Sequence, residues 1–223
     1  MIIGYKNQIE ILNNLLKKDL SSIGFLFWGP EKIGKKTIAL NFIRGIFCEN
    51  KVFGGCNNCK ICLSKINSDF LFLEKESYGI DEIKEIIKFL NSTPLISNKK
   101  VVLIDNAHLL TIEAQNAFLK TLEELPKNSI VILITSQPDL LLETICSRLL
   151  KIYFGLSSRE EIEKLLKNNS IDEKLADKII RYSFLRIGLA SDFMTNQEIL
   201  KEFEKKIRFV LSLEKTNKAN KIY

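Results

Sequence analysis

The sequence predicts an α/β fold, in which a doubly wound parallel sheet of five strands is followed by a small helical unit. Two observations predict the sheet. Five short segments are apolar on successive residues, as in parallel strands buried on both faces. Amphipathic stretches separate these segments, and strands that alternate with helices form parallel sheets. The expected strands are Gly24–Trp28, Phe70–Leu73, Val101–Ile104, Ile130–Ile134 and Lys151–Phe154.

Helical periodicity predicts the elements between the strands. The expected helices cover about Lys35–Phe47, Asp81–Leu90 and Thr111–Glu124. In the last of these, apolar residues recur every three or four positions while most charged residues face outward. Asp81 comes just before Glu82, and acidic residues in a first turn suit the helix dipole.

After Phe154 the strand pattern stops, which predicts a separate helical unit. Expected helices cover Arg159–Lys167 and then Asp172 to about Phe184, and a charged helix follows from Glu202. We therefore expect a core domain over residues 1–155 with a four-cysteine insert at 48–62. A helical lid domain over 156–200 and a charged helical tail over 201–223 complete the prediction.

Composition limits the class of protein. The chain has 223 residues, of which 46% are hydrophobic and 27% charged, as in ordinary globular proteins. No apolar run approaches the ~18 residues of a membrane helix, and the opening residues do not resemble a secretory signal. We expect a cytoplasmic protein without membrane contact. The net charge of +6 comes from scattered residues and does not decide whether DNA is bound.

A phosphate-binding loop is predicted between the first strand and its helix. The stretch Gly29–Thr37 reads GPEKIGKKT. Gly29 and Gly34 allow backbone N–H groups to turn toward an anion, and Lys35 would lie against the β- and γ-phosphates. The alternative is a plain strand–turn–helix joint with incidental glycines.

Two residues argue against metal-dependent chemistry at this loop. The pattern requires a serine or threonine hydroxyl for Mg²⁺ directly after the lysine, but that position is Lys36. Thr37 lies one residue further around the helix and should point elsewhere. Asp105 ends the third strand where a metal would be met, but Asn106 follows it and cannot accept a proton. Mg²⁺-bound ATP and hydrolysis are therefore not expected.

Four cysteines predict a metal site. Cys48, Cys56, Cys59 and Cys62 include two closely spaced CxxC pairs, the spacing that grips a tetrahedral ion. Zinc suits four sulfur ligands best, and a site saturated by protein has a structural role. An iron–sulfur cluster or free thiols are the alternatives. Cys146 stands alone and is expected to be a small buried residue.

These residues together resemble the delta-prime branch of the bacterial DNA polymerase III clamp-loader family, within the AAA+ ATPases. The resemblance covers roughly residues 1–195. It rests on Ile2–Gly4, the phosphate loop, the four-cysteine insert and the stretches 100–105, 111–124, 134–138 and 144–148. It implies a P-loop-type AAA+ fold with a zinc insert and a lid. The degenerate nucleotide residues favour delta-prime over gamma/tau.

The resemblance also implies residue roles and partners. Arg148, in Thr144–Arg148, matches the arginine finger that reaches a neighbouring subunit's ATP site, although Leu149 replaces the family's cysteine. Thr135, or Ser136 beside it, matches the polar sensor. Gly29, Gly34, Lys35, Asp105 and Thr135 would form a degenerate nucleotide site. The implied partners are gamma/tau and delta subunits, the sliding clamp and primer–template DNA.

The expected function is that of a clamp-loader subunit within the polymerase III holoenzyme that has little or no ATPase activity of its own. A self-sufficient gamma/tau-type ATPase is the first alternative, with Thr37 in place of the missing hydroxyl. A zinc-knuckle protein that binds nucleic acid is the second. Few residues follow Leu200, so we expect the family's helical collar domain to be absent.

Overall fold

A computed structural model describes residues 3–18, 20–64 and 68–219. Ile2 of the predicted motif and the last four residues of the predicted tail lie outside the described residues. Two compact units divide the chain, one over residues 5–155 and one that comprises the chain on either side of it. None of the helices in the described ranges combines the length and apolar composition that a bilayer span demands.

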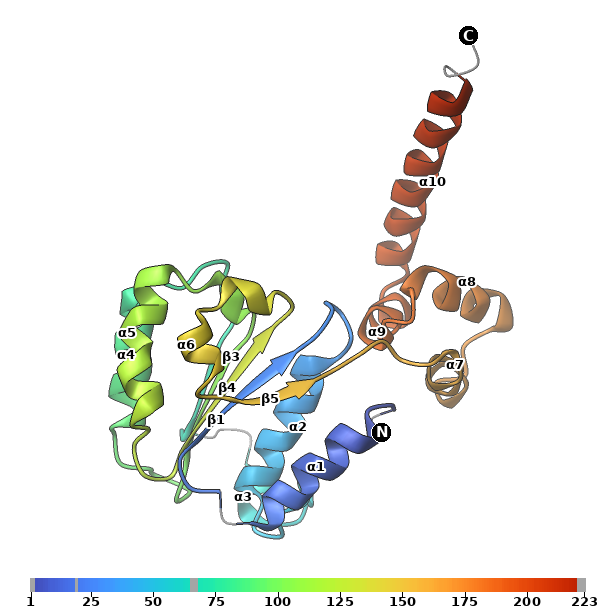
Figure 1. Cartoon of the computed structure of the whole chain (residues 1–223). Helices are drawn as coiled ribbons and strands as arrows, with labels where there is room; N and C mark the ends of the chain where they lie inside the picture. Colours follow the sequence, from blue (N-terminus) through green and yellow to red (C-terminus); the bar gives the residue numbers. More distant parts are fainter. Residues whose placement is uncertain (1–2, 19, 65–67, 220–223) are drawn as a thin grey trace. The chain divides into compact units, whose positions relative to one another are not determined.

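The first unit is built on a five-stranded sheet in which every pairing is parallel (Figure 1). Its order is β2-β3-β4-β1-β5. The predicted doubly wound α/β fold is confirmed, with strand ends shifted by no more than one residue. The strands are β1 (Ile23–Trp28), β2 (Phe70–Leu73), β3 (Lys100–Ile104), β4 (Ser129–Thr135) and β5 (Leu150–Tyr153).

Helices cover both faces of this sheet (Figure 1). Val102, Val131 and Leu26 belong to one buried cluster with Ile83 and Phe118, from helices α4 and α5. On the other face Phe25 packs edge-to-face against Phe42 of α2, with ring centroids 5.3 Å apart. Because successive strand residues point to opposite faces, continuous apolar runs are needed to fill both layers. The helices and turns are α1 (Lys6–Lys17), α2 (Lys35–Phe47), α3 (Lys60–Leu63), α4 (Ile80–Leu90), η1 (Ala107–Leu109), α5 (Ile112–Glu123), η2 (Pro138–Leu140) and α6 (Glu143–Cys146).

The second unit is helical. Ser158 caps α7: its hydroxyl accepts a hydrogen bond from Glu161 N–H, and the Glu161 carboxylate accepts one from Ser158 N–H. Phe193 is fully buried and lies 5.4 Å from Phe203 between ring centroids. The boundary expected after residue 200 falls inside the last helix. The helices are α7 (Arg159–Asn168), α8 (Glu173–Ser183), α9 (Ile187–Thr195) and α10 (Gln197–Ala219).

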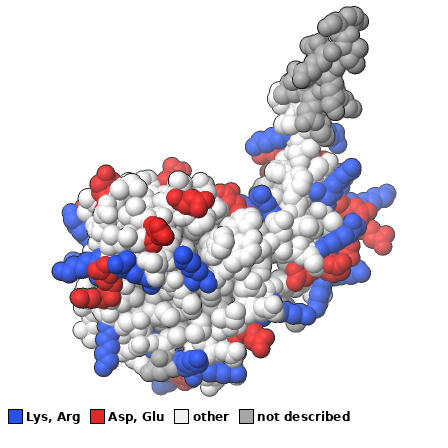
Figure 2. Space-filling view, viewed as in Figure 1, with Lys and Arg blue, Asp and Glu red and all other residues white. Residues whose placement is uncertain are grey.

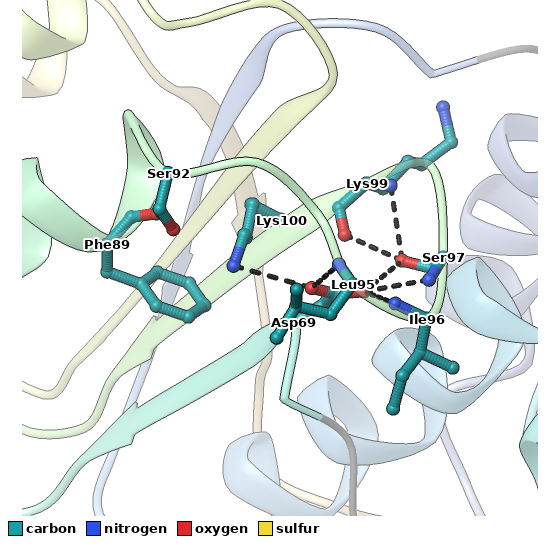
Figure 3. Close-up of polar contacts among 8 residues, drawn as sticks. All are labelled: Asp69, Phe89, Ser92, Leu95, Ile96, Ser97, Lys99 and Lys100. Atoms are coloured by element: carbon teal, nitrogen blue, oxygen red, sulfur yellow. Dashed lines mark hydrogen bonds and ion pairs between the residues drawn. The ribbon is translucent and has the colours of Figure 1, made fainter.

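A buried carboxylate ties the loop before β3 to the sheet (Figure 3). Asp69 is fully buried and accepts hydrogen bonds of 2.7–2.8 Å from the backbone N–H groups of residues 95–97. Lys100 Nζ lies 3.3 Å from Asp69 Oδ1 and 4.3 Å from the centre of the Phe89 ring. Burial opposes ionisation, but the backbone N–H donors and Lys100 outweigh it and lower the pKa of Asp69 to about 2. The network is therefore a charged and fully bonded anchor.

Candidate functional site

The parallel sheet brings the predicted nucleotide residues to one edge. Gly29 follows β1, Asp105 follows β3 and Thr135 ends β4, and β4 lies between the other two strands. Gly34 and Lys35 begin α2. The carboxyl ends of parallel strands meet at one edge, which is where such folds place ligands.

The phosphate loop is tightly fixed. Gly29 has φ 143°, and a Cβ there would lie 2.0 Å from the carbonyl oxygen of Phe154. Gly34 has φ 91°, a conformation in which glycine is strongly favoured. Lys35 is buried, and its Nζ donates to the carbonyl oxygens of Gly29 (2.7 Å) and Pro30 (2.6 Å). The lysine that would meet phosphate is thus held against its own loop.

Lys36 lies between two carboxylates. Its Nζ is 2.6 Å from Glu74 Oε2 and 3.8 Å from Asp105 Oδ2. The same atom is 5.0 Å from the centre of the Phe72 ring. Thr37 is exposed, in keeping with the expectation that it points elsewhere. The position at which a hydroxyl would bind Mg²⁺ therefore carries an ammonium group that is already paired with acidic side chains, and the residues present do not fit Mg²⁺.

Asp105 is held by its own backbone surroundings. Asp105 Oδ1 accepts from Asn106 N at 3.0 Å, and the Asp105 carbonyl accepts from the Tyr78 hydroxyl at 2.6 Å. Burial raises the pKa of Asp105, although Asn106 N–H and Lys36 oppose that rise. Asn106 has φ 51°, in the left-handed region that asparagine tolerates. Its amide offers no carboxylate to activate water.

Thr135 and Ser136 are also hydrogen-bonded within the chain. Thr135 Oγ1 accepts from Gln137 N at 3.0 Å and lies 3.2 Å from His108 Nδ1. Burial lowers the pKa of His108. The lowered pKa favours the neutral imidazole, which can accept a hydrogen bond from the Thr135 hydroxyl. Ser136 Oγ donates to Glu31 Oε1 at 3.3 Å.

The contacts that Glu74, Glu31 and His108 make with residues of this site were not predicted from the sequence. Glu74 follows β2 directly, so a carboxylate at the end of a strand beside β3 was the available signal. Glu31 and His108 make contacts to residues more than twenty positions away, and no local pattern marks such pairs.

Arg148 lies at the opposite edge of the sheet. It precedes β5, whose first residue Leu150 pairs with Phe25 in β1. The Arg148 guanidinium forms an ion pair with Glu123 at the end of α5 and donates to the Thr144 carbonyl. Its side chain is 31% exposed. The structure thus places this predicted site residue apart from the other five, beside a pocket of about 460 Å³.

The four cysteines meet in space. Their Sγ atoms all lie within 4.8 Å of one another. Cys59 N–H points to Cys56 Sγ at 3.3 Å, and the backbone N–H groups of Asn58 and Cys59 lower the pKa of Cys56 to about 6. A Cβ at Gly55 would lie 2.9 Å from Cys62 Sγ, so the backbone leaves room for the sulfurs. This donor set fits a tetrahedral ion such as zinc. The separate Cys146 is buried, as expected.

The chain is similar to known subunits of DNA polymerase III. The family model described as "DNA polymerase III, delta subunit" matches residues 4–157. DNA polymerase III subunit tau of Bacillus subtilis is 37% identical over 152 residues, which are 66% of this chain and 27% of that protein. DNA polymerase III subunit delta' of Pseudomonas aeruginosa is 33% identical over 132 residues, or 56% of this chain and 40% of that protein. The chain therefore spans well under two thirds of these relatives.

A solved structure supports the fold. The DNA polymerase III gamma subunit-related protein of Thermotoga maritima superposes with a TM-score of 0.56 and 23% identity, over 82% of this chain and 69% of that one. At such identity the likeness concerns the fold alone.

Proposed function

The chain belongs to the clamp-loader family described as DNA polymerase III, delta subunit, which has the AAA+ fold, and we propose that it serves a loader as a subunit with little or no ATPase activity. The observation that carries this proposal is the presence of two unsuitable residues beside the phosphate loop, at the carboxyl ends of the strands. Lys36 replaces the metal-binding hydroxyl, and Asn106 replaces the residue that would activate water. The sensor position, Thr135, is bonded to His108.

The proposed positive contribution of the chain is an arginine finger, Arg148. Gly29 lies four residues beyond Phe25, which pairs with Leu150, so the chain's own phosphate loop is ~13 Å along the strand from Leu150 at ~3.3 Å per residue. Arg148 precedes Leu150 and lies farther still. A guanidinium at this edge can therefore stabilise a γ-phosphate only in another subunit. Glu123 would hold it in place until that subunit docks.

The cysteine cluster has a structural role in this proposal. Zinc, when bound by Cys48, Cys56, Cys59 and Cys62, would supply a closed four-sulfur centre without an open position for substrate. Cys48 follows α2 directly, Cys56 and Cys59 precede α3, and Cys62 lies within α3. The ion would therefore fasten this insert to the helix that begins at the phosphate loop.

The partners follow from the same proposal. Gamma/tau and delta subunits would flank the chain, and the assembly would act on the sliding clamp and primer–template DNA in the cytoplasm. An arginine finger requires a neighbouring ATP site, which is why the chain is proposed to work in an assembly rather than alone.

A reconstituted loader tests the proposal. We expect the isolated chain to hydrolyse no ATP above background, and Arg148→Ala to slow hydrolysis by the neighbouring subunits at least about tenfold. Arg159→Ala is the matched control, because Arg159 is also an exposed arginine paired with a glutamate, Glu163. An unchanged rate with Arg148→Ala in an intact assembly would refute the finger assignment. Steady turnover by the isolated chain would refute the non-hydrolysing role.

A second candidate, a self-sufficient ATPase of gamma/tau type, is favoured by one observation. The subunit tau relative has higher identity than the delta' relative, 37% against 33%. The same turnover assay separates this candidate from the non-hydrolysing subunit. If the chain is a self-sufficient ATPase, the chain alone should hydrolyse ATP, and Lys35→Ala should abolish that hydrolysis.

A further inference from the structure

We propose that Lys36 is a tethered cation that takes the place of the divalent metal and by itself closes this site to metal-bound nucleotide. The inference deepens the proposed function and rests on it, because it explains how a phosphate loop of this family can be kept inactive. It concerns a single side chain and its two acidic neighbours.

The first argument is charge. Glu74 and Asp105 follow the adjacent strands β2 and β3, and two carboxylates that converge on one point repel each other unless a cation lies between them. Lys36 Nζ lies 2.6 Å from the Glu74 carboxylate and 3.8 Å from that of Asp105. The pair is thus compensated by the chain itself, where a metal-dependent site would use the ion.

The second argument is attachment. Lys36 is the second residue of α2, so the helix fixes its Cα beside the phosphate loop. The ammonium also lies over the Phe72 ring, a contact that further confines a cation. Because the cation is covalently linked to the site, it competes with free Mg²⁺ at a high effective concentration.

The third argument is chemical incompatibility. Mg²⁺ requires oxygen ligands in octahedral geometry, and an ammonium group has no lone pair to offer. Two cations at ~4 Å in a partly buried site repel strongly enough to change affinity by well over tenfold. Metal and lysine therefore exclude each other, and the exclusion depends on residue 36 rather than on the loop glycines or Lys35.

The test measures metal binding directly and does not need hydrolysis. The electron paramagnetic resonance spectrum of Mn²⁺–ATP is followed as protein is added, for the native chain and for Lys36→Thr. The threonine restores the hydroxyl and frees both carboxylates. We expect Lys36→Thr to bind the Mn²⁺–ATP complex at least about tenfold more tightly than the native chain. Lys36→Arg, which keeps the cation, should stay closed.

Two controls make the outcome decisive. Lys84→Thr removes an exposed charge that is 69% accessible and pairs with Asp81, so it corrects for net charge alone and should change nothing. The fluorescence of Trp28, which lies at the end of β1, reports whether each variant is folded. Lys36→Ser replaces Lys36→Thr if the latter does not fold.

Native chain that binds Mn²⁺–ATP as tightly as the threonine variant would overturn the proposal, and so would a folded Lys36→Thr or Lys36→Ser without any gain. These results are independent of the arginine finger, because no neighbouring subunit is present. A failed Arg148 experiment would leave the Lys36 result intact, and the reverse also holds.

Discussion

Asp69→Asn is expected to destabilise the first unit strongly, because it removes the charge from a fully buried anchor (Figure 3). The neutral amide keeps one acceptor oxygen but directs an N–H₂ group at backbone donors of residues 95–97. Lys100, whose side chain is only 5% exposed, would lose its counter-ion. Both effects leave buried polar groups without favourable partners.

The magnitude follows from the pKa of Asp69. The pKa is about 2 in the folded chain, against 3.8 for an ordinary aspartate. At 1.36 kcal/mol per pKa unit, this lowering of the pKa corresponds to about 2 kcal/mol of stability near neutral pH. Removing one partner of a buried ion pair costs ~3–5 kcal/mol. We therefore expect Asp69→Asn to lower the free energy of unfolding by about 3 kcal/mol.

The sign of the pH dependence is fixed by the same shift. Because the folded pKa is lowered, the stabilisation is fully present above the unfolded pKa and is lost as the pH falls through about 2. The native chain should therefore lose more stability between pH 4 and pH 2 than the Asp69→Asn variant does. The buried carboxylate is responsible for that difference.

Urea unfolding followed by the fluorescence of Trp28, the single tryptophan, measures this effect in the unit that contains Asp69. Asp81→Asn is the matched control, because Asp81 pairs with Lys84 while its side chain is 90% exposed, and it should cost less than ~0.5 kcal/mol. A loss below about 1 kcal/mol for Asp69→Asn, or equal pH profiles for native chain and variant, would refute the reasoning.

Three further expectations concern other parts of the chain. Elemental analysis of chain purified without added metal should give about one zinc per chain, and Cys59→Ser should abolish it; iron or no metal would contradict the assignment. Gly29→Ala should destabilise the first unit by more than ~2 kcal/mol in urea unfolding, because its Cβ would meet the Phe154 carbonyl; an unchanged midpoint would count against the loop geometry. Gln115→Ala should lower the free energy of unfolding by ~2 kcal/mol, since the buried side-chain amide is hydrogen-bonded to the backbone of Leu110, Leu140 and Leu142. Gln137→Ala is the control variant.

The regular part of the fold was predictable from the sequence for a simple physical reason. A parallel sheet covered on both faces requires runs of consecutive apolar residues such as Val101–Ile104 and Ile130–Ile134. Such runs predict strands without any tertiary information. The four-residue helices α3 and α6 could not be predicted in this way, because one turn has no periodicity to detect. Their place is set by the cysteine cluster and by the contacts of Gln115.

The candidate site was predictable in its residue types but not in its pairings. The positions of Lys36 and Asn106 beside the phosphate residues follow from local motifs. The partner of Lys36 does not, because Glu74 is 38 residues away and approaches only when β2 joins the sheet edge. Likewise Glu123 reaches Arg148 across 25 residues. Long-range ion pairs depend on topology, which short sequence windows do not contain.

Because its strands are parallel, the sheet has two different ends, and an assembly that joins unlike ends has a direction. All strands run the same way: the rim at their amino ends carries Arg148, and the rim at their carboxyl ends carries the phosphate loop and Lys36. Contacts between unlike rims join molecules head to tail rather than as symmetric pairs. In the proposed loader, this chain would supply its arginine to the ATP site of one neighbour, while its own site would gain nothing from an arginine of the other neighbour. The chain would therefore stand at the end of a row of subunits that hydrolyse ATP.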